Sequence, residues 1–381
     1  MKVVVVGAGL AGLRTAEALR DKGFDGELVL LGEEVHLPYD RPPLSKHVLR
    51  GEREPMYLRP EDQYDALDLD LRLGTAATGL DLAAQQVRTA AGPVGYDQVV
   101  LATGATPRRL PGSPGVVLRT LDDSRALAPY LREGGRIAIV GAGLIGCEVA
   151  ASARAKGAEV DVVDVLDRPL LRVLGSAVAS RVQDLHESHG VRFHLGTGVT
   201  AAGPDRLELA DSTVLEVDVV LEAMGVVPST GWLDGSGLEI ADGVVCDDVG
   251  RAADGVHAVG DVARWSDGAG GSRRMEHWTS AAEQAQVVAA GVLGKREPLD
   301  GPPYWWSDQY DLKLQGLGLP SQDDDVQVVD VGPRGRPLAL YSRGGRLTGV
   351  VGFSAAAFVM RLRAQVGAGA PVEDVLAALS G

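Results

Sequence analysis

Two glycine-rich turns with identical spacing carry the clearest chemical signal in this sequence. The first places glycine at positions 7, 9 and 12, and the second at positions 141, 143 and 146 (Gly7, Gly9, Gly12 and Gly141, Gly143, Gly146). A helix that begins after such a turn offers unpaired N–H groups and the positive end of its dipole to a pyrophosphate. Glycine lets the backbone approach that group closely. Each turn therefore predicts a dinucleotide site.

The segments around each turn are those needed to position it. Residues 3–6 form a short apolar run before the first turn, residues 13–19 have helical periodicity after it, and residues 28–31 form a second apolar run. The same order recurs with a strand at 137–140, a helix at 147–156 and a strand at 160–164. Strand–turn–helix–strand is the context in which a Gly-x-Gly-x-x-Gly match becomes specific.

An acidic residue lies at the end of the second strand of each unit or just after it, and it indicates which nucleotide is bound. Glu33 and Asp164 are placed to accept hydrogen bonds from ribose hydroxyls. A carboxylate at Asp164 would repel the 2′-phosphate of NADP, so we expect NADH to be preferred. Arg168 and Arg172 follow soon after and leave NADPH open; Arg172 and Gly225 complete the candidates for this site.

Composition excludes several classes of function. The chain of 381 residues carries 37 Lys and Arg against 52 Asp and Glu, a net charge of −15. Such a charge disfavours nucleic acid and anionic membranes as partners. No apolar run approaches the roughly 18 residues of a membrane span. Cys147 and Cys246 are the only cysteines and predict no disulfide framework. We expect a cytoplasmic protein, because the apolar start leads into a glycine turn rather than an export signal.

The remaining chain predicts further strands and a different C-terminal region. Strands are expected at 99–102 and 256–259, followed by a helix at 280–293 with Ser280 and Glu283 as a capping box. After the prolines at 298, 302 and 303, apolar runs separated by glycine turns predict an antiparallel sheet with strands at 326–331, 337–341 and 347–353. Closing helices are expected at 355–366 and 372–379.

Five further motifs carry a family resemblance. They are Pro-Tyr-Asp-Arg-Pro-Pro-Leu-Ser-Lys at 38–46, Leu-Ala-Thr-Gly at 101–104, Ala-Val-Gly-Asp at 258–261, Glu-His-Trp-Thr-Ser-Ala-Ala-Glu-Gln at 276–284 and Trp-Trp-Ser-Asp-Gln-Tyr-Asp-Leu-Lys-Leu-Gln at 305–315. Together with the two glycine turns, they resemble the ferredoxin reductase family of FAD-dependent pyridine-nucleotide oxidoreductases, over essentially the whole chain.

This resemblance implies an α/β fold with two Rossmann-like dinucleotide-binding domains, glutathione-reductase-like, and a C-terminal α+β domain with an antiparallel sheet. The FAD-binding domain would be discontinuous, comprising residues 1–110 and 231–297. The NAD-binding domain would be residues 111–230, and the C-terminal domain residues 298–381.

The resemblance also implies residue roles. Lys46, Glu148 and Trp278 would be the catalytic residues: Glu148 would pair with Lys46, and Trp278 would lie near the isoalloxazine edge. FAD contacts would come from Gly7, Gly9, Gly12, Glu33, Arg41, Lys46, Thr103, Gly104, Arg108, Gly260, Asp261 and Trp278. The nicotinamide dinucleotide would bind Gly141, Gly143, Gly146, Asp164, Arg172 and Gly225.

The implied function is an NADH-dependent reductase with tightly bound FAD. Electrons would pass from NADH through FAD to a 2Fe-2S ferredoxin that supplies a monooxygenase or dioxygenase. A rubredoxin reductase, an NADH oxidase or diaphorase, and a redox sensor like apoptosis-inducing factor that acts by interaction remain alternatives.

Several features stay open at this level. A ferredoxin could dock on the arginine pairs 50/53, 273/274 or 361/363, and the chain could be a monomer or a homodimer. His186 and His189, with His194 nearby, are expected on a solvated helix face rather than at a metal. Cys147 is expected to take no part in thiol chemistry, because no second cysteine is near it in sequence.

Overall fold

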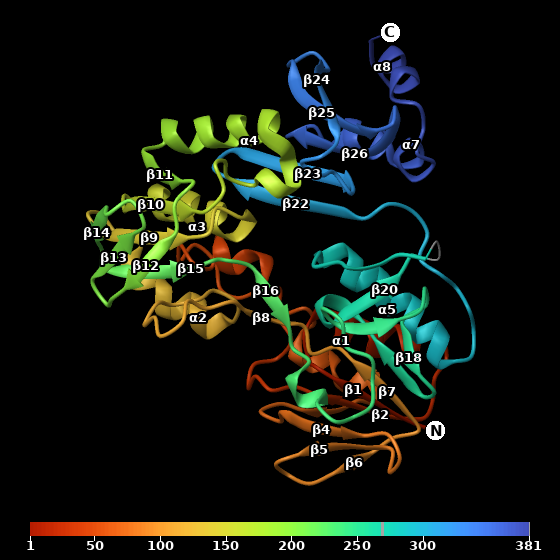
Figure 1. The fold of residues 1–381 in the computed structure, drawn as a ribbon. Coiled ribbons are helices and arrows are strands. Elements are labelled where there is room, and N and C mark those ends of the chain that lie inside the picture. Colours follow the sequence, from red (N-terminus) through yellow and green to blue (C-terminus); the bar gives the residue numbers. More distant parts are fainter. Residues whose placement is uncertain (268–269, 381) are drawn as a thin grey trace. The chain divides into compact units, whose positions relative to one another are not determined.

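The computed structural model describes residues 1–267 and 270–380, and its contacts divide the chain into two compact units. The first unit comprises residues 1–40, 56–106 and 226–300. The second unit comprises residues 41–55, 107–225 and 301–381. Figure 1 traces the chain through both. The three-domain division expected above stays a prediction, since these units group the residues differently.

A six-stranded sheet forms the centre of the first unit. Its neighbouring strands are parallel except for β18 and β19, an antiparallel pair at one edge of the sheet. The order is β18 (Arg251–Ala253), β19 (Val256–Ala258), β7 (Gln98–Leu101), β1 (Lys2–Val6), β2 (Glu27–Leu31) and β3 (Asp70–Arg72). Two helices, α1 (Leu10–Asp21) and α5 (Trp278–Val292), contact each other. The apolar strands are buried because parallel strands are covered on both faces.

Smaller sheets complete the first unit. They are β4 (Ala77–Asp81), β5 (Gln86–Thr89) and β6 (Val94–Gly95); β17 (Val244–Cys246), β20 (Ala263–Ser266) and β21 (Ser272–Arg274); and β8 (Ala105–Pro107) with β16 (Val226–Pro228).

One helix start in the first unit differs from the prediction. The capping box at Ser280 is wrong, because α5 begins at Trp278 with His277 as its N-cap residue and no side-chain cap. Ser280 lies in the first turn instead and is 1% exposed. A serine followed by a glutamate three residues later also occurs within a helix, so this short motif placed the boundary too late.

The second unit contains a parallel sheet and an antiparallel sheet. The parallel sheet has the order β11 (Val191–Leu195), β10 (Glu159–Asp164), β9 (Arg136–Val140) and β15 (Val219–Glu222). The helices associated with it are α2 (Leu121–Leu127), α3 (Leu144–Ala155) and α4 (Leu171–Ser188), and a small sheet consists of β12 (Val199–Ala202), β13 (Arg206–Leu209) and β14 (Val214–Glu216).

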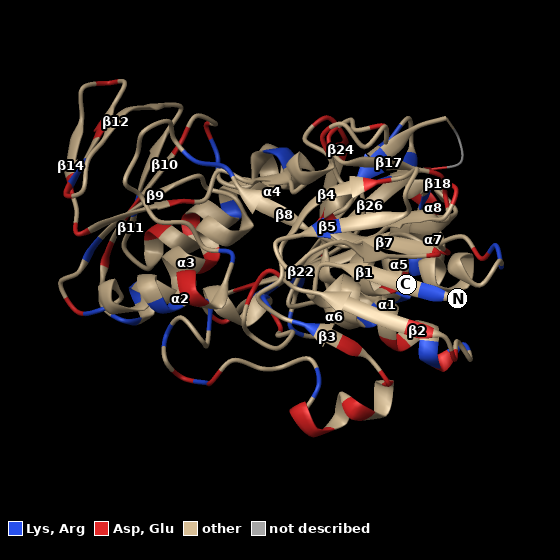
Figure 2. Cartoon of the chain, turned by 90° about the horizontal axis from the view of Figure 1, so that it is seen from below, with Lys and Arg blue, Asp and Glu red and all other residues tan. Residues whose placement is uncertain are grey.

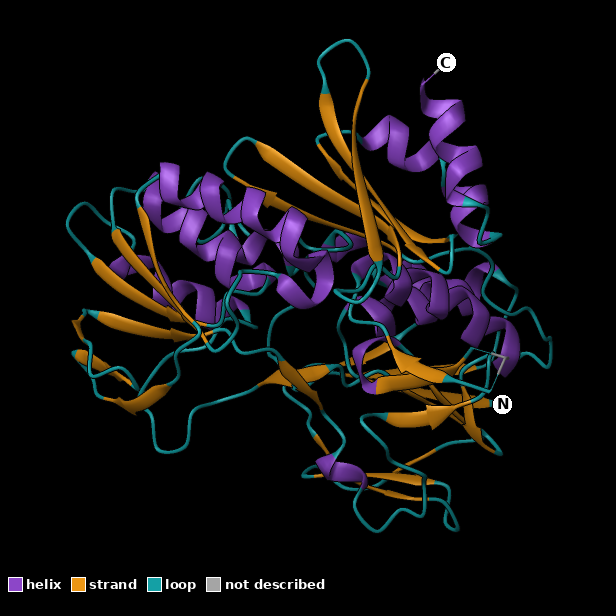
Figure 3. Ribbon diagram, turned by 45° about the horizontal axis from the view of Figure 1, so that its top comes forward, coloured by secondary structure: helices purple, strands orange, loops and turns teal. Residues whose placement is uncertain are grey.

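The C-terminal part of the second unit is the predicted antiparallel sheet. Its order is β22 (Tyr304–Gln309), β23 (Leu312–Gly318), β26 (Arg346–Phe353), β25 (Arg336–Arg343) and β24 (Asp325–Val331), and its helices are α6 (Ala356–Arg361), α7 (Arg363–Gly367) and α8 (Val372–Ser380). Figure 3 shows these strands and helices. Leu174 and Val178 of α4 share a buried apolar cluster with Trp305 and Tyr341, so α4 packs against this sheet. The mixed α/β fold class with an antiparallel C-terminal sheet is confirmed.

Charged residues of both signs are interspersed over the chain. Figure 2 shows Lys and Arg lying among Asp and Glu. The candidate docking arginines follow this pattern: Arg50 pairs with Glu52, Arg273 with Asp267, and Arg274 with Asp242 and Glu276.

Candidate cofactor sites and the Lys46–Glu148 pair

The first glycine turn joins β1 to α1 and has one open position. A Cβ on Gly7 would lie 2.2 Å from the carbonyl oxygen of Ala102, and one on Gly12 would lie 1.9 Å from that of Gly7. Gly9, the N-cap residue of α1, differs: its Cβ would meet nothing within 4 Å, and α1 has no side-chain cap. Two glycines are therefore required by packing, and the third borders open space beside a helix N-terminus.

The second turn repeats this geometry between β9 and α3. A Cβ on Gly141 would lie 2.4 Å from the carbonyl oxygen of Ala223, and one on Gly146 would lie 2.0 Å from that of Gly141. Gly143 is the N-cap residue, has no capping side chain, and again borders open space. Both turns thus leave room for a pyrophosphate at the uncapped N–H groups, so the residues present fit FAD and NADH.

The two acids that follow these units differ in their surroundings. Glu33 is exposed just beyond the end of β2. Asp164 ends β10, where its Oδ2 accepts a hydrogen bond from the Ala142 amide at 2.7 Å and its Oδ1 accepts one from the Leu166 amide at 2.9 Å. Asp164 therefore also braces the second glycine turn, a contact that its position in the sequence did not reveal.

Other predicted residues of the first unit gather at the first turn or near it. A Cβ on Gly260 would lie 2.9 Å from the Cβ of Ala11, so Gly260 lies against the first turn of α1. The Gly260 amide donates to Gln284 of α5 at 2.8 Å. Thr103 Oγ1 donates to the Ser229 carbonyl at 2.9 Å, and Gly104 has a φ of 70°.

The remaining predicted residues of both units lie in loops or at the starts of helices. Asp261 lies in the short turn after β19, and Trp278 Nε1 donates to Asp40 at 2.8 Å. In the second unit, Arg41 donates to the Arg119 carbonyl at 2.6 Å, and the Arg108 amide donates to the Gly225 carbonyl at 2.9 Å. Arg172 is exposed in the first turn of α4.

Lys46 and Glu148 form a buried ion pair within the second unit. Lys46 Nζ lies 2.6 Å from Glu148 Oε2, and the two side chains are 8% and 5% exposed. Lys46 directly follows a 3₁₀ turn (Pro42–Ser45), and Glu148 lies on α3. A buried carboxylate needs such a partner, because an isolated charge is costly to desolvate.

Two serines complete the contacts of Glu148. Ser45 Oγ donates to Glu148 Oε2 at 2.6 Å, and Ser307 Oγ donates to Oε1 at 2.7 Å. Ser307 was not among the predicted site residues. A signal for it exists, since residues 305, 307 and 309 alternate on the buried face of β22, and a serine and a glutamine there need polar partners.

A polar pocket of about 360 Å³ adjoins this pair within the second unit. Its lining combines basic, acidic and hydroxyl groups: Lys46, His47, Arg50, Glu148, Ala151, Ser152, Asp308, Tyr310 and Lys313.

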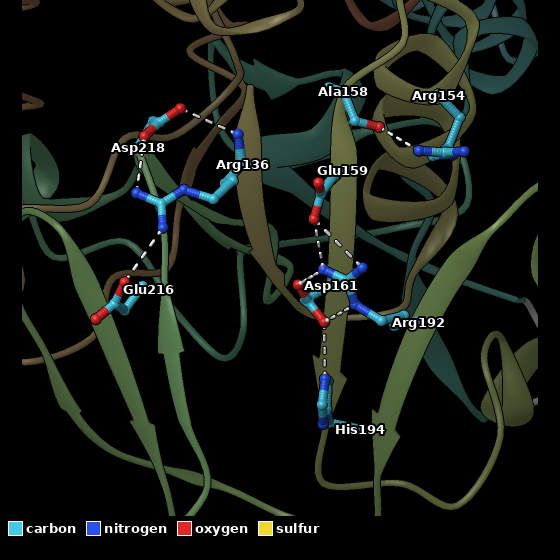
Figure 4. A network of polar contacts seen from close by, with 9 residues as sticks. All are labelled: Arg136, Arg154, Ala158, Glu159, Asp161, Arg192, His194, Glu216 and Asp218. Atoms are coloured by element: carbon cyan, nitrogen blue, oxygen red, sulfur yellow. Dashed lines mark hydrogen bonds and ion pairs between the residues drawn. The ribbon is translucent and has the colours of Figure 1, made fainter. Parts of the chain in front are cut away.

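The histidines do not lie where the sequence suggested. The solvated face predicted for His186 is wrong: His186 is fully buried, and burial lowers its pKa to about 4. His189 is exposed and stacks on Tyr310, whereas His194 bonds to Asp161 in the network that Figure 4 shows. Among the described residues, no cluster of His, Cys, Asp or Glu has the arrangement of a metal site.

Both cysteines are free and buried. Burial raises the pKa of the Cys147 thiol far above its usual range and raises that of Cys246 to about 12. Neither thiol is therefore activated as a nucleophile. Among the described residues, no helix is long and apolar enough to cross a membrane.

Comparison with known proteins gives matches over nearly the whole chain. The family described as pyridine nucleotide-disulphide oxidoreductase matches residues 1–285, and the family described as reductase C-terminal matches residues 304–379. The ferredoxin reductase component of chlorobenzene dioxygenase from Cupriavidus sp. is 39% identical, with 93% of this chain and 89% of the relative covered. Putidaredoxin reductase from Pseudomonas putida is 34% identical, with 91% and 87% covered.

Solved structures agree with these relatives. The covalent putidaredoxin reductase–putidaredoxin complex matches with a TM-score of 0.92 at 30% identity, covering 100% of this chain and 99% of the other. The resemblance inferred from the motifs is thereby confirmed. With three quarters of its length in the family match and two glycine turns that fit dinucleotides, this chain belongs to the pyridine nucleotide-disulphide oxidoreductase family.

Proposed function

We propose that this protein is an NADH-dependent FAD flavoprotein reductase. It passes electrons from NADH to a 2Fe-2S ferredoxin that supplies a monooxygenase or dioxygenase, and it acts in the cytoplasm. The observation that carries the proposal is the pair of glycine turns, each with an open second glycine at an uncapped helix. Relatives that span nearly the whole chain are named as ferredoxin reductase components of dioxygenases.

In this proposal, each unit binds one cofactor at its glycine turn. In the first unit, Gly9 and the start of α1 would receive the FAD pyrophosphate, with Gly260 and Asp261 nearby and Glu33 available to the ribose. In the second unit, Gly143 and the start of α3 would receive that of NADH, with Asp164 at the ribose. Bound FAD supplies the chemistry that accepts two electrons from NADH and releases them one at a time.

Lys46 is the residue that we propose to act on the flavin, and Glu148 fixes the direction of its side chain. The ion pair at 2.6 Å holds the Lys46 ammonium group in place, because Glu148 is held in turn by two serine hydroxyls. Trp278 would form part of the flavin wall, with its indole N–H anchored on Asp40.

The ferredoxin partner is proposed from the relatives and from the docking arginines. Putidaredoxin reductase, a relative over 91% of this chain, has been solved in a covalent complex with putidaredoxin. The docking surface here would be local, because the chain as a whole is acidic.

Anaerobic stopped-flow of the purified yellow protein tests the proposal. We expect NADH to bleach the flavin absorption rapidly and a 2Fe-2S ferredoxin to restore it rapidly. Rapid restoration by rubredoxin or dioxygen, with ferredoxin inactive, would reassign the acceptor. A bleached complex that persists with every acceptor would mean a redox sensor instead of a reductase.

A further inference from the structure

A line of buried hydrogen bonds leads away from Glu148 into the C-terminal sheet. Ser307 Oγ lies 2.7 Å from Glu148 Oε1, and Gln309 Nε2 lies 3.2 Å from Ser307 Oγ. Gln309 Oε1 lies 2.9 Å from His186 Nε2, and His186 Nδ1 lies 3.2 Å from the Tyr310 hydroxyl. Ser307, Gln309 and His186 are fully buried, so they have no water to replace these partners.

The chemistry of each group fixes the direction of every bond in this line. An ionised Glu148 can only accept, so the single proton of the Ser307 hydroxyl must point to it. Ser307 is then left with lone pairs for Gln309, which must present its NH₂ group. Consequently the carbonyl of Gln309 faces His186, which requires the proton of that histidine on Nε2. Nδ1 is therefore the acceptor for the Tyr310 hydroxyl.

The surroundings support this neutral form of histidine. Burial lowers the pKa of His186 to about 4, so its ring carries one proton at neutral pH. Each group in the line thus donates toward Glu148, and no buried acceptor faces another acceptor.

The C-terminal sheet is the source of this support. Ser307 and Gln309 lie on the buried face of β22, whereas Glu148 is on α3 and His186 on α4. The reductase C-terminal match begins at residue 304, the first residue of β22. The C-terminal region therefore supplies the donor to Glu148 Oε1, whereas Ser45 and Lys46 contact Oε2.

We propose that Ser307 and Gln309 are positioning residues for the reductase reaction, which hold Glu148 in line with Lys46 through a one-way series of hydrogen bonds that begins at Tyr310 and His186. The proposal rests on the proposed function, in which Lys46 and Glu148 serve the flavin. Within this series, Ser307 contacts Glu148 and Gln309 contacts Ser307, so both residues act on Lys46 only through Glu148.

The first test compares three variants of the FAD-loaded protein in single-turnover reduction by NADH. Ser307→Ala removes the donor, and Ser307→Cys keeps the shape of the side chain with a slightly larger atom that donates only weakly. Ser342→Ala removes another buried serine of the same sheet and is the control. We expect both Ser307 variants to lower the limiting rate about tenfold, equivalent to about 1.4 kcal/mol. The NADH concentration at half-saturation should stay within about twofold, because the lost contact orients a charge rather than binding NADH.

A spectroscopic test does not depend on activity. In protein labelled with ¹⁵N-histidine, with His186 assigned by its loss in His186→Gln, we expect Nε2 to be protonated and Nδ1 unprotonated at neutral pH. A proton on Nδ1, or on both nitrogens, would overturn the direction of the series.

The outcomes separate this inference from the proposed function. A Ser307→Ala variant with the limiting rate of the wild type, or a Ser307→Cys variant that matches the wild type while Ser307→Ala is slow, would overturn the positioning role. If the wild type itself fails to bleach with NADH, the proposed function fails, and the histidine spectrum still decides the hydrogen-bond series.

Discussion

At the scale of single residues, two carboxylates of the second unit, Asp164 and Glu148, each combine a proposed role at a cofactor with contacts that hold the local structure. Asp164, the acid that we propose for the ribose, also accepts two backbone amides that shape the glycine turn. Glu148 balances Lys46 and accepts two serine hydroxyls. A single substitution at either position changes both the charge and the local structure. Each is therefore tested together with a second substitution that distinguishes the two effects.

Cofactor preference should depend on the charge at Asp164. We expect Asp164→Ser combined with Val165→Arg to raise the NADPH-to-NADH ratio of kcat/KM about tenfold or more, corresponding to about 1.4 kcal/mol of differential binding. Serine retains an acceptor for the turn, and Val165 is 67% exposed, so arginine there has room to reach a 2′-phosphate. Steady-state kinetics with both nucleotides measure the ratio. An unchanged ratio would refute the ribose assignment, and Val165→Arg alone is the control.

The Lys46–Glu148 pair should show strong coupling in stability. We expect Lys46→Met to lower the free energy of unfolding by about 3 kcal/mol, because it leaves Glu148 buried without its cation. Adding Glu148→Gln should recover most of that loss. Urea unfolding of the four members of the cycle measures the coupling energy. Additive effects would show that the two charges do not depend on each other.

At the scale of elements, each strand–turn–helix unit uses its glycines for two different purposes. Gly7, Gly12 and their counterparts permit close packing, whereas Gly9 and Gly143 keep a helix N-terminus open. The same residue type is therefore required by packing at some positions and leaves open space at others, where we propose that the cofactors bind.

Matched alanine substitutions should reveal this difference. Gly9→Ala should leave the fold stable but reduce FAD content, because its Cβ projects only into the open space. Gly12→Ala should destabilise the fold by about 1–3 kcal/mol through overpacking. Gly143→Ala should retain FAD and raise the KM for NADH. Flavin-to-protein absorbance ratios and thermal unfolding measure these effects; normal FAD content in Gly9→Ala would contradict the assignment of the first turn.

At the scale of the whole molecule, each unit carries a buried histidine that makes the fold sensitive to acid. Burial lowers the pKa of His257 in the first unit and of His186 in the second to about 4. A free imidazole has a pKa near 6.5, so the unfolded chain takes up these protons first as the pH falls. The contribution of these two histidines to the free energy of unfolding is fully present above about pH 6.5 and is lost progressively toward pH 4.

This linkage predicts a specific acid dependence. Between pH 7 and pH 5, each histidine should contribute about 2 kcal/mol to the loss of stability. His257→Gln should reduce that loss by one histidine's share, whereas His189→Gln, at an exposed position, should leave it unchanged. Denaturant unfolding at the two pH values measures the difference. Equal losses in wild type and His257→Gln would show that His257 is not held neutral.

The sequence by itself determined the features that depend on neighbouring residues. The glycine turns, their strands and helices, and the acid at position 164 follow from spacing within about 30 residues, because turn geometry and strand and helix periodicity are local. The fold class followed from the family resemblance that these repeats and the motifs between them carry. The start of α5 was misplaced because a short capping motif is weak by itself.

Only the tertiary structure decided which distant residues meet. Ser307 reaches Glu148 across 159 positions, and Gln309 reaches His186 across 123. Gly260 lies against Ala11 because β19 pairs with β7, which pairs with β1. Such contacts depend on how sheets and helices pack, and packing selects partners by shape and by the need to satisfy every buried polar group. That is why His186, read from the sequence as a surface residue, lies buried among the groups that support Glu148.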